Sequence, residues 1–219
     1  MAVFNEIAND YDDWYKTKLG EFVDKIETKA AFELLNVKSG DKILDAGCGT
    51  GNFTKKIKES NKNIDIIGID ISAKMLSIAK QKNPNIKFKK MDLNNLKFDD
   101  NTFDKIISMA AFEFIKKPKK VINELLRVLK PKGELIIGTI NPNSKWGEMY
   151  QSKEFKDTIF KHAIFHTIDD LSNIKKNKVK DIKKCLFTPP DIDINKLNKS
   201  IEEEFTDNRP GFYIIKWIK

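Results

Sequence analysis

The segment "ILDAGCGTGNF", residues 43–53, places an apolar strand directly before a loop in which Gly47, Gly49 and Gly51 alternate with other residues. A kinase-type phosphate loop would carry Lys and then Ser or Thr after its last glycine, whereas this loop carries Asn and Phe there. A dinucleotide-binding loop has the spacing G-x-G-x-x-G, and Gly51 comes one residue too early for it. The ligand of this loop must therefore be inferred from the strands that follow it.

The bulk properties of the chain fit one globular domain, residues 1–219. Hydrophobic residues make up 40% and charged residues 33%, so a packed core can form. The longest apolar runs are strand-sized, and residues 1–15 lack the basic and apolar regions of a secretory signal. Two cysteines, Cys48 and Cys185, are too few for a disulfide framework or a metal site. We expect a cytoplasmic monomer or homodimer that does not insert into a membrane.

The net charge of +8 comes almost entirely from lysine. Of the 40 basic residues only Arg127 and Arg209 are arginines, the side chain best suited to bidentate contacts with phosphates and bases. The densest lysine runs lie at residues 116–120 and 175–184. We interpret these runs as solvated faces and do not expect nucleic acid as a partner.

Short apolar strands alternate with helices between residues 42 and 140. This alternation predicts a parallel sheet with right-handed crossovers. The expected fold class is therefore α/β, a Rossmann-like doubly wound sheet of seven mostly parallel strands with helices on both faces. The strands of this core are expected at residues 42–47, 64–70, 86–92, 103–110 and 133–140, and the helices at 52–59, 73–82 and 118–129.

The flanking segments complete the expected domain. Residues 1–36 show helical periodicity with a polar break at 17–20, which predicts a helical lid before the core at 37–140. Residues 141–180 are predicted to form a loop followed by helices at 152–165 and 167–176, as a lid over the substrate. Residues 181–219 are expected to contribute two late strands.

Three aspartates stand where successive predicted strands end: Asp45, Asp70 and Asp92. Ligands of open parallel sheets bind at this edge. A carboxylate after the second strand can accept hydrogen bonds from both hydroxyls of a ribose, and one after the third can accept from an exocyclic amine such as adenine N6. Asp45 suits an ammonium group, directly or through a water. Since these acids would repel a pyrophosphate, the pattern favours a nucleoside that carries an amino-acid zwitterion.

Four segments resemble the successive motifs of class I S-adenosylmethionine-dependent methyltransferases. They are "LDAGCGTGNF", "IIGIDIS", "KKMDLNNLKFDDNTFD" and "LLRVLKPKGELIIGT". The resemblance covers about residues 37–139 and is greatest for the small-molecule, methyltransferase-11 and quinone-biosynthesis branch. It implies S-adenosyl-L-methionine as the cofactor and S-adenosyl-L-homocysteine as the product. Lys132 departs from the family pattern, which usually has a glycine there, and this affects a turn rather than the site.

The resemblance also assigns a part of the cofactor to each matching residue. The ribose would be held by Asp70, and the sulfonium would lie over Met109. The adenine would be held by Ile71, Met75, Asp92 and Leu93. The methionine portion would lie under Tyr11 and be held by Asp45, Gly47, Cys48, Gly49 and Gly51.

Several of these residues have a purely structural alternative. Asp45 could tie down the adjacent loop, Asp92 could cap a turn, and Met109 could belong to the core. A reactive role for Cys48 is disfavoured because nothing basic adjoins it in the sequence.

Two histidines and several aromatic residues lie outside these motifs. His162 and His166 have the i, i+4 spacing of zinc ligands on a helix, but no Glu stands between them and no third ligand is evident, so no metal is expected. The aromatic residues are interpreted as packing more than as substrate contacts; they are Trp14, Tyr15, Trp146, Tyr150, Phe155 and Phe165.

Methyl transfer from a sulfonium requires alignment of the reactants, and a base only when the nucleophile loses a proton. No catalytic residue is assigned. Glu113 and Asn141 are weak candidates, and Glu113 is interpreted as a solvated acid at a helix start.

A small molecule is the expected acceptor. The segment "MAAFEF" follows the fourth strand in place of the Asn/Asp-Pro-Pro-aromatic motif of nucleic-acid amino-methylating relatives, and no Pro-Cys nucleophile is present. The alternatives are a tRNA or rRNA methyltransferase, a non-catalytic S-adenosylmethionine-binding module, and a nicotinamide dehydrogenase. The last fails on glycine spacing and on Asp92.

Overall fold

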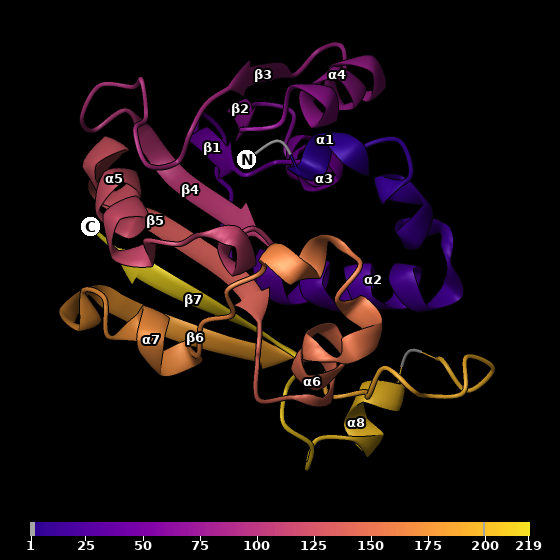
Figure 1. Cartoon of the computed structure of the whole chain (residues 1–219). Helices are drawn as coiled ribbons and strands as arrows, with labels where there is room; N and C mark the ends of the chain where they lie inside the picture. The colour runs from indigo at the N-terminus through magenta and orange to yellow at the C-terminus, as the bar shows by residue number, and fades with distance from the viewer. Residues whose placement is uncertain (1–2, 199) are drawn as a thin grey trace.

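The computed structural model describes residues 3–198 and 200–219. Seven strands form one sheet in the order β3-β2-β1-β4-β5-β7-β6 (Figure 1). Neighbouring strands are parallel from β3 to β5, and β7 is antiparallel to both β5 and β6. The predicted α/β fold with a mostly parallel seven-stranded sheet is confirmed. The strands are β1 Lys42–Ala46, β2 Asp65–Asp70, β3 Lys87–Lys90, β4 Phe103–Met109, β5 Leu129–Ile140, β6 Val179–Cys185 and β7 Phe212–Ile218.

Helices cover both faces of this sheet. The α-helices are α1 Val3–Glu6, α2 Lys18–Leu34, α3 Asn52–Ser60, α4 Ala73–Lys82, α5 Pro118–Val128, α6 Lys145–Gln151, α7 Ile168–Ser172 and α8 Ile201–Glu204. Short 3-10 turns lie at η1 Tyr11–Lys16, η2 Phe112–Phe114, η3 Lys153–Phe155, η4 Ile159–His162 and η5 Lys176–Lys178.

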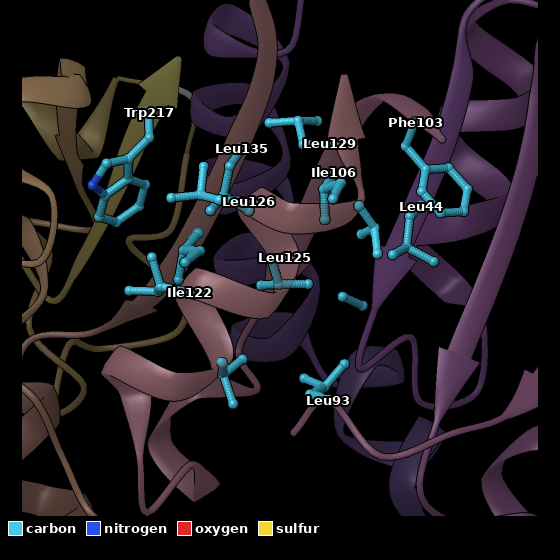
Figure 2. Close-up of a cluster of buried hydrophobic side chains, with 14 of the residues drawn as sticks. Leu44, Leu93, Phe103, Ile106, Ile122, Leu125, Leu126, Leu129, Leu135 and Trp217 are labelled. Carbon is cyan, nitrogen blue, oxygen red and sulfur yellow. The ribbon is translucent and has the colours of Figure 1, made fainter. Parts of the chain in front are cut away.

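One face of the sheet is packed by α5 and α7. The apolar stripe of α5 contributes Ile122, Leu125 and Leu126, which meet Leu44 and Ile106 from the strands (Figure 2). On the other face α2 and α3 pack against the opposite side chains of the same strands. Since each central strand is buried on both faces, its sequence is apolar almost throughout, and this is what made the strands recognisable.

Strand β5 starts earlier than predicted. Leu129 already pairs with Phe103 of β4, four residues before Gly133, where the strand was expected to begin. Between them Lys132 adopts the left-handed region with φ of 63°. This conformation explains why a glycine would be favoured at this turn, and the turn lies away from the carboxyl ends of the strands.

The N-terminal segment differs from the predicted helical lid. The polar break was expected at residues 17–20, but α2 begins there, because the Thr17 hydroxyl accepts a hydrogen bond from the Gly20 amide at 3.0 Å and caps the helix. The interruption lies instead at residues 7–17, where only the turn η1 forms.

The helix predicted at residues 152–165 does not form; only η3 and η4 lie there. The Thr158 hydroxyl accepts from the Phe160 amide at 3.2 Å, which favours a short turn over a helix. Phe160 then stacks on Tyr150 with 4.1 Å between the ring centroids. His162 and His166 consequently do not share a helical face, and the Nε2 atom of His166 lies 2.9 Å from the carbonyl oxygen of Ile115.

Candidate cofactor and acceptor site

A cavity of about 550 Å³ opens at the carboxyl ends of β1, β2 and β4. Its volume is in the range of small-molecule sites. All the residues predicted to bind the cofactor line it except Gly51; they are Tyr11, Asp45, Gly47, Cys48, Gly49, Asp70, Ile71, Met75, Asp92, Leu93 and Met109.

The glycine loop follows the wall of this cavity. Gly47 has φ of 84°, and a Cβ atom there would lie 2.7 Å from the Cβ of Ala111, so a side chain cannot be placed. Gly49 has φ of 52°, and a Cβ atom there would meet nothing within 4 Å. Gly51 instead serves packing: it caps α3 with φ of 79°, and a Cβ atom there would lie 2.9 Å from the Phe88 ring.

Asp70 joins the end of β2 to the glycine loop. Its Oδ2 accepts from the Gly49 amide at 3.0 Å, and its Oδ1 accepts from the Ser72 amide at 2.8 Å. Burial raises the pKa of this carboxyl, although both backbone hydrogen bonds oppose the shift. Each oxygen keeps a lone pair, so the carboxylate can accept from two adjacent hydroxyl groups.

Asp45 combines both roles that the sequence left open. Only 2% of it is exposed, and its Oδ2 accepts from the Thr54 hydroxyl at 2.6 Å, which ties the strand to α3. It also lines the cavity, where its Oδ1 accepts no hydrogen bond from the described residues. Burial raises the pKa of Asp45 to about 7, and the charge of Asp70 adds to the effect. A cationic ligand would favour its ionised form.

Asp92 likewise caps a turn and lines the cavity. Its Oδ1 accepts from the backbone amide and the side-chain amide of Asn94, both at 2.8 Å. The backbone bond from Asn94 lowers the pKa of this exposed carboxyl. Asp92 therefore stays ionised at neutral pH beside Leu93 and Ile71, which give this end of the cavity an apolar wall.

Met109 and Cys48 lie on the inner wall. A Cβ atom on Gly138 would lie 2.6 Å from the sulfur of Met109, so the glycine on β5 leaves room for this side chain. Burial holds the pKa of the Cys48 thiol well above its ordinary value. The thiol is therefore protonated, as expected for a cysteine without a reactive role.

A strap formed by residues 3–17 crosses the mouth of the cavity. Asp12 reaches the glycine loop, where its Oδ1 accepts from the Thr50 hydroxyl at 2.6 Å and from the Asn52 amide at 2.9 Å. Its other oxygen pairs with Lys82 of α4 at 2.5 Å. Asn5 accepts from the Ser72 hydroxyl at 2.6 Å. The sequence indicated Tyr11 in this region and gave no signal for these two contacts.

Glu113 is the clearest departure from the sequence interpretation. The expected solvated acid is wrong, since Glu113 is 1% exposed. Its Oε1 accepts from the Thr139 hydroxyl and from the Ile140 amide, both at 2.7 Å. The second candidate, Asn141, binds the Pro210 carbonyl at 2.9 Å, and it is not among the residues that line the cavity.

Two acids that were not predicted from the sequence, Asp24 and Glu27, line the part of the cavity formed by α2, which we call its inner end. The sequence of this helix was interpreted only for its helical periodicity, not for its acidic residues. Of the aromatic residues singled out above, Tyr15 lines the cavity, while Trp146 is buried and donates to the Thr188 carbonyl at 2.8 Å. Within residues 3–198 and 200–219, no three His, Cys, Asp or Glu side chains are grouped as metal ligands.

None of the helices that the structure describes combines the length and apolar character that a bilayer crossing requires.

Comparison with known proteins gives the family. A methyltransferase-domain family model matches residues 37–203. An uncharacterised protein of Methanocaldococcus jannaschii is 35% identical over 176 residues, which is 80% of each chain. A demethylmenaquinone methyltransferase of Thermotoga maritima is 34% identical over 66% of this chain and 63% of its own length. The chain belongs to the class I S-adenosylmethionine-dependent methyltransferases.

Solved structures share the fold over nearly the whole chain. A Thermotoga maritima methyltransferase, named as a possible histamine N-methyltransferase, has a TM-score of 0.76 and 22% identity over 99% of this chain and 98% of its own. A putative methyltransferase bound to the Haloferax volcanii Trm112 activator has a TM-score of 0.74 and 20% identity over 100% of this chain and 98% of its own. At these identities the likeness concerns the fold alone.

The cavity fits S-adenosylmethionine, the cofactor of this family. Its wall supplies carboxylate acceptors at three strand ends, and the Oδ1 of Asp45 is without a hydrogen bond from the described residues. At Gly49 no side chain separates the backbone from the cavity. The donors of the cofactor, which are the ribose hydroxyls, the adenine amine and the ammonium group, match these acceptors.

The pKa of Asp45 predicts a pH dependence of cofactor binding. If Asp45 binds the ammonium group, it must be ionised in the complex. The affinity for S-adenosylhomocysteine should then fall about tenfold for each pH unit below 7, because free Asp45 is increasingly protonated there. Calorimetry between pH 7.5 and 5.5 measures this slope. Asp45→Asn keeps the size of the side chain and should bind more weakly with a reduced slope, whereas a flat wild-type profile would contradict the assignment.

The contacts of Asp12 predict that the strap slows cofactor release. Asp12→Asn removes the charge that pairs with Lys82, and we expect S-adenosylhomocysteine to dissociate about three- to tenfold faster. Stopped-flow displacement measures this rate. Asp13→Asn is the matched control, because Asp13 pairs only with the exposed Lys16 and should leave the rate unchanged. Equal rates for the wild type and Asp12→Asn would show that these contacts do not hold the cofactor.

Proposed function

We propose that the chain transfers a methyl group from S-adenosylmethionine to a small-molecule acceptor. The observation that carries this proposal is the lining of the cavity. Besides the residues assigned to the cofactor, such as Asp92 and Met109, it is lined by residues of η1 and α2, among them Tyr15 and Glu27. Tyr15 and Glu27 have no part in the proposed cofactor contacts, so the inner end offers space for an acceptor.

The proposed roles follow from the positions of the residues. Asp70 would hold the ribose, Asp92 and Leu93 the adenine, and Asp45 with the glycine loop the methionine portion. The bound cofactor supplies a methyl group already activated on a sulfonium. The chain then has to align the acceptor with that group and exclude water, which Met109 and the strap can do by enclosing the cavity.

Two features favour a small acceptor over RNA. The strap is bonded through Asp12 to the glycine loop and through Asn5 to Ser72, and its residues Phe4, Tyr11 and Tyr15 line the cavity. The relative whose name carries an acceptor, the demethylmenaquinone methyltransferase of Thermotoga maritima, is named for a small molecule.

A transfer assay with methyl-labelled S-adenosylmethionine tests the proposal. We expect label to move to one or more members of a panel of small amines, phenols and quinols, and not to transcribed tRNA or ribosomal RNA. Met109→Ala should lower the transfer rate, because the acceptor and methyl group lose a wall of the cavity, and this loss should exceed any change in S-adenosylhomocysteine affinity. Transfer to RNA alone would contradict the proposal, as would binding of the cofactor without transfer to any acceptor class.

A further inference from the structure

Two carboxyl groups at the inner end of the cavity are not needed by the cofactor. Glu27 of α2 lines the cavity and forms no side-chain hydrogen bond or ion pair with the described residues. Its neighbour Asp24 already has a partner, because Lys56 of α3 binds both of its oxygens at 2.5 and 2.6 Å. Glu27 therefore presents the unpaired carboxyl at this end of the cavity, and this inference rests on the proposed function.

Glu113 supplies a second, independent sign of a missing partner. It is 1% exposed, and its Oε2 has no hydrogen-bond partner among the described residues. An unpaired buried carboxyl oxygen is costly and needs a compensating contact. Glu113 does not itself line the cavity, but its sequence neighbours Ala111 and Phe114 do, and its charge acts on Glu27 and on Tyr11. Its charge therefore adds to the negative potential at the same end of the site.

Aromatic rings also line this cavity. Phe4 and Phe114 line the cavity and contact each other edge to face, with 4.7 Å between ring centroids. Phe114 also lies 6.0 Å from Phe160, which stacks on Tyr150. Carboxylates within a wall of aromatic rings suit an organic ammonium group, because both attract a desolvated cation.

The same acids disfavour a phenol or quinol acceptor. Burial, followed by the charges of Glu113 and Asp24, holds the pKa of Glu27 well above its ordinary value, and only Lys56 opposes the shift. Burial together with nearby acids, Glu113 among them, also raises the pKa of the Tyr11 and Tyr150 phenols. A phenolic acceptor placed beside them would be kept protonated and poorly nucleophilic by the same field.

We propose that the acceptor is a small organic amine whose nitrogen binds at Glu27, with Glu113 adding negative potential behind it. The ammonium nitrogen first gives a proton to the Glu27 carboxylate. Its lone pair then forms the bond to the methyl carbon while the carbon–sulfur bond breaks and that electron pair stays on sulfur. The positive charge thereby passes from the sulfonium to the methylated nitrogen, where the carboxyl groups of Glu27 and Glu113 stabilise it.

The test compares amines with alcohols of the same shape. The chain is first saturated with S-adenosylhomocysteine, which also verifies cofactor binding. It is then titrated separately with each amine and with the alcohol of the same shape, and the two affinities are compared. The pairs are phenethylamine with 2-phenylethanol and hexylamine with 1-hexanol. We expect each amine to bind at least about tenfold more tightly than its alcohol. Glu27→Gln should reduce this preference to less than about threefold without changing the affinity for S-adenosylhomocysteine. Glu21→Gln, at an exposed position of the same helix, should retain it.

The outcomes separate this inference from the proposed function. Equal binding of amines and alcohols, no binding of either, or a preference that survives in Glu27→Gln overturns the amine assignment. Transfer of labelled methyl to 1,4-naphthoquinol but to neither amine also overturns it and leaves the proposed function standing. Failure of the wild-type chain to bind S-adenosylhomocysteine overturns the proposed function itself. Label on the amine nitrogen, with a transfer rate lowered in both Glu27→Gln and Glu113→Gln, supports the assignment.

Discussion

The hydrogen bond from the Gly49 amide to Asp70 is the contact on which the shape of the site depends. It joins the loop after β1 to the end of β2, beside the bonds from the Gly47 and Cys48 amides to the Ile69 carbonyl at 2.8 and 2.9 Å. These bonds require a backbone that turns through positive φ at Gly47 and Gly49. A side chain at Gly47 would break this arrangement, since Ala111 occupies the space. The loop is therefore held open toward the cavity by backbone geometry.

The parallel sheet turns this local contact into a site. Because β1 and β2 pair in parallel register, with Asp45 opposite Gly68, the carboxyl ends of the strands meet at one edge. Burial of Asp45 and Asp70 at that edge raises the pKa of both carboxyls. Such burial disfavours the charged form of both carboxyls, and a ligand that brings an ammonium group and hydroxyl donors would stabilise it. The same buried carboxyls therefore favour a ligand with an ammonium group and disfavour a ligand with a phosphate.

Most of the fold and the cofactor end of the site could be predicted from the sequence, because both depend on local patterns. Buried strands give apolar runs, and the residues that follow them, such as Asp70 and Asp92, must lie at the same edge. The family motif usually has a glycine where this chain has Lys132, and Lys132 adopts the left-handed conformation that a glycine favours.

The acceptor end depends on contacts between distant segments and was not predictable in this way. Glu113 was interpreted as solvated because it stands at a predicted helix start, yet it is buried and bonded to Thr139 and Ile140 of β5. Glu27 lies on α2 in line with the buried residues Val23 and Ala31, and a charged side chain within an apolar stripe gave no sign of the cavity beside it. The helix expected at residues 152–165 failed because Thr158 and the stacking of Phe160 favour a turn. In each case a tertiary contact outweighed a local preference.

The most direct test of the central claim is the affinity of S-adenosylhomocysteine for the wild-type chain and for Asp70→Ala, measured by calorimetry at pH 7.5. Asp70 anchors the Gly49 amide and, in the proposed role, accepts from two ribose hydroxyls, so the account predicts tight wild-type binding that weakens at least about tenfold in the variant. Equal affinities, or no binding of this compound by the wild-type chain, would contradict it.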